Sequence, residues 1–95
     1  MILRMYSIFD AAIGAYTPPF AARAAGEAVR SFKSTLLDPN HPMAKFPEHY
    51  SVVRVGLYDD ATGQMSPLPA PEVLATAQAL IATASLTDRL SQTEE

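Results

Sequence analysis

The chain has 95 residues, which is the usual length of one domain, and its net charge at neutral pH is −3. Hydrophobic residues make up 48% of it and charged residues 18%, a composition that indicates a globular fold and excludes a disordered chain. Because it contains no cysteine, disulfide bonds and thiolate metal clusters are excluded, and a reducing cytoplasm suits it.

The charges are distributed unevenly along the chain. Residues 1–58 contain six basic and four acidic side chains, which gives +2, whereas residues 59–95 contain one basic and six acidic side chains, which gives −5. An acidic C-terminal part on a mildly basic body is one reason to expect a nucleic-acid partner. It is equally what a solvated C-terminus looks like, so charge alone leaves both interpretations open.

The first predicted element is a strand over residues 2–9, "ILRMYSIF", because its side chains alternate between two faces. Leu3, Met5 and Phe9 share one face. The other face carries the remaining large side chains, Ile2, Arg4, Tyr6 and Ile8. The stretch is too short to span a bilayer and lacks the cleavage site of a signal peptide, so we expect no membrane association.

The next elements are an extended edge segment and a helix. After a turn around Gly14, the prolines of "YTPPF" impose an extended backbone and cannot donate to a ladder. From about Ala24 to Leu37 the period becomes helical. One apolar stripe runs along this helix: Ala25, Ala28, Val29, Phe32 and Leu36. Arg23 and Arg30 lie on its outer side, and Asp38-Pro39 ends it.

The segment "DPNHPMAKFPEHY" contains both histidines, His41 and His49, and poses the question of a metal or acid–base site. The histidines are eight residues apart with no helix to bring them together, and the usual zinc spacings are absent. No serine or cysteine stands beside them in a nucleophile context. We therefore predict an irregular, proline-stiffened loop with no metal, no cofactor and no catalytic role, and a protein that is not an enzyme.

The second half begins with the clearest strand, "YSVVRVGLY" at residues 50–58, followed by a hairpin turn at residues 59–63. We expect the short strand "QMSPL" to end at Pro67, and Pro71-Glu72 to open a last helix. The apolar stripe of that helix is Val73, Leu74, Ala77, Leu80, Ile81 and Ala84. Residues 1–87 are predicted to form one domain, with residues 88–95 as an acidic, frayed tail.

This order of elements predicts a small α+β domain: a mainly antiparallel sheet of three to four strands with two helices on one face. We place the helices on the face that carries Leu3, Met5 and Phe9 from the first strand. The long second strand would contribute Val53, Val55 and Leu57 to the same core. The helices would close it with Val29, Phe32, Leu36, Leu74 and Ile81.

The opposite sheet face then exposes a mixed arginine and tyrosine set. The candidate nucleic-acid-binding residues are Arg4, Tyr6, Tyr16, Arg23, Arg30, Arg54 and Tyr58. Guanidinium groups neutralise phosphates, and aromatic rings stack on unpaired bases at about 1–3 kcal/mol each. Two other interpretations stay open: these residue types are ordinary for a strand, and the same face, with Ile2, Ile8 and Val52, suits a dimer interface.

Several motifs in one order resemble a known family. They are "MYSIFD" (5–10), "PPF..R..GEA.R.F" (18–32), "DPNH" (38–41), "PEHY" (47–50) and "G.YDD.TG" (56–63). Over roughly residues 2–68 the chain resembles the small nonstructural protein of gokushovirus-type microviruses, which are phages with circular single-stranded DNA genomes. The family usually has "PEDY", so His49 replaces a carboxylate here.

The resemblance implies a nonstructural, DNA-associated role in the host bacterial cytoplasm, during replication or the switch to single-strand synthesis and packaging. It brings no catalytic residues. The favoured hypothesis is a phage accessory protein that binds single-stranded DNA. The alternative is an adaptor or regulator of phage or host replication or assembly proteins that does not touch DNA. Salt-sensitive DNA binding distinguishes the two.

Overall fold

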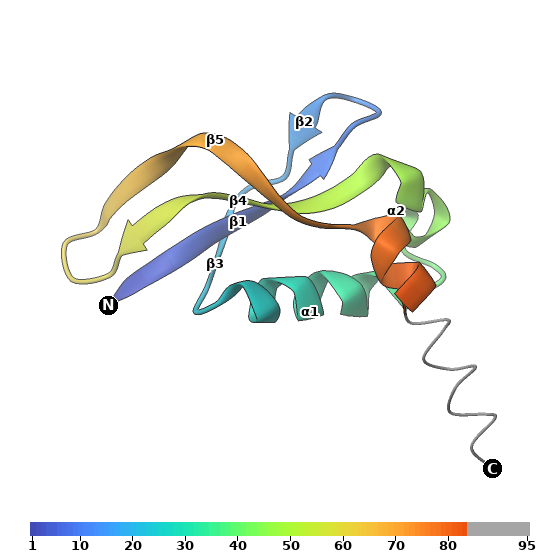
Figure 1. The fold of residues 1–95 in the computed structure, drawn as a ribbon, viewed down its shortest axis with the longest axis horizontal. Coiled ribbons are helices and arrows are strands. Elements are labelled where there is room, and N and C mark those ends of the chain that lie inside the picture. Colours follow the sequence, from blue (N-terminus) through green and yellow to red (C-terminus); the bar gives the residue numbers. More distant parts are fainter. Residues whose placement is uncertain (84–95) are drawn as a thin grey trace, which may run out of the picture.

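The computed structural model describes residues 1–83 and shows a curled antiparallel sheet with a helix across one face (Figure 1). The strands are β1 (Ile2–Asp10), β2 (Ala15–Tyr16), β3 (Phe20–Ala22), β4 (Tyr50–Asp59) and β5 (Gln64–Thr76). The helices are α1 (Ala25–Leu36), α2 (Pro42–Lys45), a 3₁₀-helix (Pro47–His49) and the segment 77–83. The predicted α+β class is confirmed. The predicted tail, its boundary after residue 87 and Ala84 lie outside the described residues.

The sheet has the strand order β2-β1-β4-β5, and β3 pairs with the same edge of β1 as β2 does. β2 and β3 are therefore one edge strand, interrupted at Pro18 and Pro19, which explains five strand segments where three to four were predicted. Thr17 joins the two halves to β1. Its N–H donates to the Ile8 carbonyl at 2.9 Å, and its own carbonyl accepts from the Ser7 hydroxyl at 2.7 Å.

A β-bulge decides which side chains share a face. Met5 pairs with Gly56 but Tyr6 pairs with Arg54, so Val55 is an extra residue in β4. Because strand side chains alternate, one extra residue inverts the faces beyond it. The face toward α1 carries, across β1 and β4, the pairs Ile8–Val52, Tyr6–Arg54 and Arg4–Leu57.

The predicted core face was therefore wrong. Tyr6, Ile8 and Val52 form the core cluster with the helices, whereas Met5 and Val53 are buried on the other side of the sheet. The sequence shows two apolar faces on β1, and alternation alone does not say which of them a helix covers.

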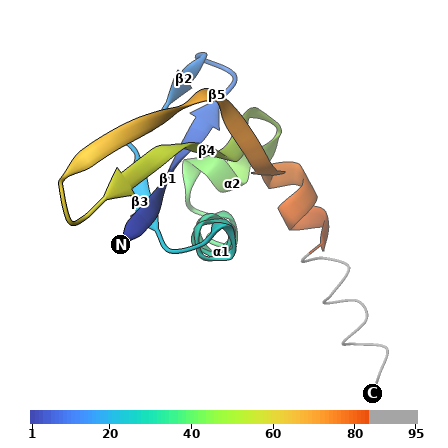
Figure 2. The ribbon, with the colours of Figure 1, turned by 60° about the vertical axis from the view of Figure 1, so that its left-hand side comes forward.

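The amphipathic stripe of α1 is confirmed. Ala28, Phe32 and Leu36 are buried, and Ala25 and Val29 pack beside them against the cluster. Ala77 is fully buried in the same cluster, and Leu80 and Ile81 pack on it. Two helical segments therefore close one side of the sheet, and Figure 2 shows α1 end-on beneath it.

The prediction of an irregular loop after α1 is wrong, because the proline-rich segment forms two short helices. Pro42 and Pro47 each begin a short helix, α2 and the 3₁₀-helix. A proline is tolerated in the first helical turn because the N–H that it lacks would have no intrahelical partner there. The Nδ1 of His41 caps α2 by accepting the Met43 N–H at 3.2 Å.

The hairpin turn after β4 is confirmed, with Gly63 at φ +75° and its N–H donating to the Asp59 carbonyl at 2.7 Å. The predicted end of the following strand at Pro67 and the helix start at Pro71 were wrong. β5 continues to Thr76 because it is an edge strand, where a missing N–H is tolerated. The helix begins after Thr76, whose hydroxyl accepts the Ala79 N–H at 3.2 Å.

Candidate nucleic-acid interface

The structure separates the three candidate tyrosines from one another, places Arg4 and Arg54 on one sheet face, and brings the backbone of Arg23 against the Arg4 guanidinium. Arg4 and Tyr6 lie on β1, Arg54 and Tyr58 on β4, and Tyr16 on β2. Arg23 lies between β3 and α1, and Arg30 lies within α1. The candidate residues therefore do not share the one exposed sheet face that the sequence had predicted.

Tyr6 is a core residue. Its side chain is fully buried, and its ring lies 6.1 Å from the ring of Phe20. Its hydroxyl has no hydrogen-bond partner among the described residues, and neither has the buried Nε of Arg54, its cross-strand neighbour. The expectation that Tyr6 is exposed for stacking is wrong, because the bulge and the helices turn this face inward.

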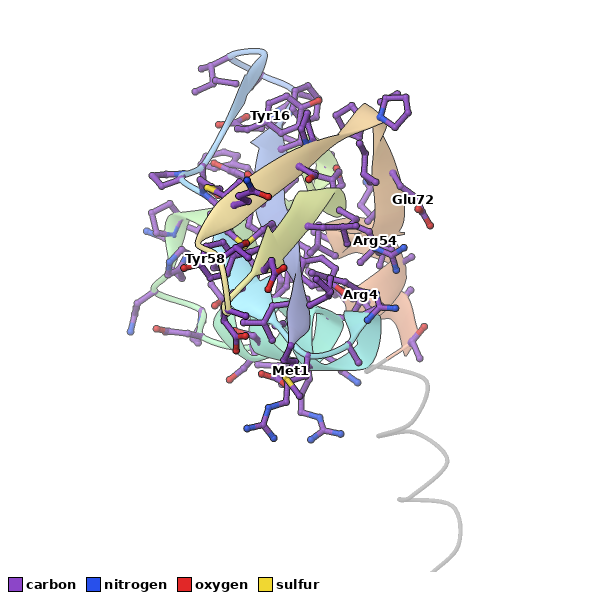
Figure 3. All side chains as sticks on the ribbon, turned by 90° about the vertical axis from the view of Figure 1, so that its left-hand side faces the viewer. Met1, Arg4, Tyr16, Arg54, Tyr58 and Glu72 are labelled. Carbon is purple, nitrogen blue, oxygen red and sulfur yellow. The ribbon has the colours of Figure 1, made fainter. Side chains whose placement is uncertain are left out.

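The other two candidate tyrosines point elsewhere. Tyr58 pairs with Leu3, and the bulge at Val55 places it on the sheet face away from Arg4 and Arg54 (Figure 3). Tyr16 is about half exposed, but its ring packs 4.7 Å from that of Phe9, at the far end of β1. Neither ring lies beside the arginines.

Three arginines form what we call the arginine strip: Arg4, Arg23 and Arg54. Arg4 and Arg54 occupy diagonal positions on one face of adjacent strands and point to the same side of the sheet (Figure 3). The Arg4 guanidinium contacts the Arg23 carbonyl at 3.4 Å, which ties the strip to the start of α1. Arg4 and Arg23 are exposed, and Arg30 is exposed further along α1.

Glu72 is the acidic residue that meets the strip. Its carboxylate lies 3.5 Å from a terminal nitrogen of Arg54, and it is 57% exposed. The Arg54 side chain is 25% exposed and its Nε is buried, so an anion from solution would have to bind its terminal nitrogens, one of which Glu72 contacts.

No metal site was found among residues 1–83: no three His, Asp or Glu side chains there converge on one point. His41 caps α2, and His49 lies 3.6 Å from the neighbouring Glu48 carboxylate. Within the same residues, no helix is long and apolar enough to cross a membrane.

Sequence reasoning missed an apolar hollow of about 190 Å³ at the hairpin end of the sheet. Met5, Pro19, Val55, Met65 and Pro67 are among the residues that line it. Gly56 also lines it, and β5 passes so close to Gly56 that an added Cβ would lie 2.6 Å from the Ser66 carbonyl oxygen. The signal in the sequence was Gly56 itself, an isolated glycine in a strand.

Comparison with known proteins gives one match. No curated protein and no solved structure matches the chain. A model of the family described as Phage ORF5 protein matches residues 3–80, which extends the resemblance from β1 through β5 and into the helical segment 77–83. The chain therefore belongs to the Phage ORF5 protein family.

Proposed function

We propose that this phage protein binds single-stranded DNA, without catalysis, through the arginine strip. The observation that carries the proposal is the position of Arg4 and Arg54 on one face of adjacent strands, with the backbone of Arg23 against the Arg4 guanidinium. Guanidinium groups bind phosphates in bidentate geometry and release condensed counterions on doing so. Arg30 is a further exposed arginine, within α1.

The biological setting is part of the same proposal. The sequence motifs resemble the nonstructural protein of gokushovirus-type microviruses, whose genomes are single-stranded DNA. Family membership supports a phage protein. In this setting the protein would act in the host bacterial cytoplasm during genome replication or the switch to single-strand synthesis, and it would hold exposed single strands through their phosphates.

A titration of labelled oligonucleotides tests the proposal. Single-stranded and duplex oligonucleotides of equal length are titrated with the protein at 50 and 200 mM salt, the range over which phosphate contacts lose their strength. We expect the single strand to bind at low salt and to weaken strongly at high salt. An absence of single-strand binding at low salt contradicts the proposal.

The apolar hollow favours a second candidate function, that of an adaptor for a protein partner. Leu57 and Met65, which line the hollow, are 37% and 59% exposed. Exposed apolar surface of this kind is typical of protein interfaces. Either a phage or host replication protein, or a second copy of this chain, would fit such a surface.

Substitutions on β5 distinguish the adaptor from the DNA-binding protein. Met65→Glu places a charge at the hollow, whereas Val73→Glu places the same charge on an equally exposed apolar residue outside it. An adaptor forms a stoichiometric complex with the co-expressed phage replication protein that Met65→Glu abolishes and Val73→Glu preserves. It also shows no salt-sensitive affinity for DNA.

A further inference from the structure

A second hollow, of about 170 Å³, lies between the sheet and the two helices α1 and α2. Its apolar walls are Ile8 on β1, Phe20 on β3, Phe32 on α1 and Met43 on α2. Ser31, Thr35 and His41 complete the lining. The hollow is therefore aromatic and apolar inside, with three hydrogen-bonding side chains.

The three polar side chains retain hydrogen-bonding capacity. The Nδ1 of His41 accepts the Met43 N–H, so a neutral imidazole carries its proton on Nε2 and can donate it. The Thr35 hydroxyl donates to the Ser31 carbonyl at 3.3 Å, which leaves the Thr35 oxygen free to accept. The Ser31 hydroxyl makes no hydrogen bond within residues 1–83, so it can donate or accept one.

The size of the hollow limits what it can hold. A protein cavity of about 150 Å³ accommodates one benzene molecule. A space of about 170 Å³ therefore suits a single six-membered ring and is small for a fused purine. A pyrimidine base is such a ring, and its edge carries hydrogen-bond donors and acceptors to which His41, Thr35 and Ser31 can bond.

The hollow lies close along the chain to one residue of the arginine strip. Phe20 begins β3 and Arg23 follows its last residue, so along an extended chain they are about 10 Å apart. Ala22, between them, pairs with Arg4.

We propose that this hollow, the base pocket, binds one pyrimidine base of single-stranded DNA while the arginine strip binds the adjacent phosphates. The inference rests on the proposed function and adds to it a pyrimidine preference. It also supplies the ring contact that the three tyrosines, being buried or on other faces, do not provide.

The methionines allow a direct test by NMR of methyl-labelled protein. Met43 lines the base pocket, whereas Met5 and Met65 line the apolar hollow at the other end of the sheet. On saturation with oligothymidine we expect the Met43 methyl signal to shift and those of Met5 and Met65 to stay. An oligonucleotide of equal length that lacks every base should leave Met43 unshifted. If Met43 does not move while oligothymidine is bound, or if Met5 and Met65 move instead, the base pocket is refuted.

Affinities of two serine variants provide the second test. Ser31→Met fills the base pocket from its exposed rim, and Ser34→Met makes the same change at an exposed position of α1 that does not line it. In the wild-type protein and in Ser34→Met, oligothymidine should bind roughly five- to a hundredfold more tightly than the abasic oligonucleotide. Ser31→Met should lose that difference, and oligoadenine should bind less tightly than oligothymidine.

The outcomes separate this inference from the proposed function. Equal binding of oligothymidine and the abasic oligonucleotide by the wild-type protein refutes the base pocket and leaves phosphate binding intact. A difference that persists in Ser31→Met places base recognition elsewhere and also refutes it. If neither oligonucleotide binds, both the proposed function and the base pocket fail.

Discussion

Tyr6 illustrates how the surroundings of one residue determine its role. Its ring fills the core while its hydroxyl, buried without a partner among the described residues, contributes nothing favourable there. Tyr6→Phe should leave the free energy of unfolding unchanged or raise it, because it removes an unsatisfied polar group. Tyr6→Ala should lower it by about 3–5 kcal/mol. Urea denaturation measures both. A stable Tyr6→Ala protein with weakened DNA affinity would instead indicate a stacking role.

The N-terminal amine makes the stability of the fold depend on pH in the alkaline range. Its pKa is raised above the ordinary 8.0 chiefly by a 2.6 Å hydrogen bond to the Asp60 carboxylate, and further by the charges of Asp60 and Asp59, against a smaller opposing effect of desolvation. Because the folded pKa is the higher one, this stabilisation is complete below pH 8 and is lost as the pH rises through the folded pKa.

Thermal unfolding of wild-type protein and Asp60→Asn measures that dependence. The wild-type melting temperature should exceed that of the variant below pH 8, and the gap should close at higher pH as the amine loses its proton. A gap that stays constant across this range would show that Asp60 acts through something other than the charge of the amine.

Among the elements, the β4–β5 hairpin depends on close backbone contact at Gly56. A Cβ added there would lie 2.6 Å from the Ser66 carbonyl oxygen, a backbone atom that cannot rotate away. Gly56→Ala should therefore lower the free energy of unfolding by about 1–3 kcal/mol. Gly26→Ala is the matched control, because no atom lies within 4 Å of its added Cβ and alanine favours α1. The control should be neutral or stabilising by up to about 1 kcal/mol. Equal urea midpoints for both variants would mean that β5 does not approach β4 so closely.

The elements that could be predicted from the sequence are those specified by residues close together in the chain. α1 and the long strands β1 and β4 follow from local periodicity and stop signals, and so they were predicted with nearly correct ends. The bulge at Val55 could not be predicted, because an extra residue is defined only against the partner strand. That bulge parts Tyr58 from Arg54, so the tyrosines do not share a face with Arg4 and Arg54, and the role of all the candidate residues in DNA binding stays a prediction.

The start of the last helix shows the same limit. Pro71 and Glu72 have the local signature of a helix N-terminus, yet both belong to β5. Glu72 pairs there with Arg54, and tertiary pairing with β4 outweighs the local preference. Thr76, an equally good capping residue, begins the helix instead.

At the scale of the whole molecule, the acidic C-terminal residues and the basic arginine strip belong to different parts of the chain. Residues 88–95 carry three acidic and one basic side chain, while the arginine strip is basic. Deleting residues 88–95 should tighten binding of single-stranded DNA at low salt and have little effect at high salt, where charges are screened. A chain with Asp88→Asn, Glu94→Gln and Glu95→Gln should behave like the deletion. If only the deletion tightens binding, length rather than charge is responsible.

The salt dependence of single-strand affinity tests the arginine strip most directly. For single strands, the slope of log K against log salt is about −0.7 per neutralised phosphate. Arg4→Gln combined with Arg23→Gln changes two exposed residues of the strip. The exposed Lys45, beyond the opposite end of α1, provides the control Lys45→Gln. We predict that the double variant binds more weakly at low salt with a slope shallower by about 1.4, and that Lys45→Gln keeps the wild-type slope. An unchanged slope in the double variant, or an equal loss in Lys45→Gln, would contradict binding of single-stranded DNA through the arginine strip.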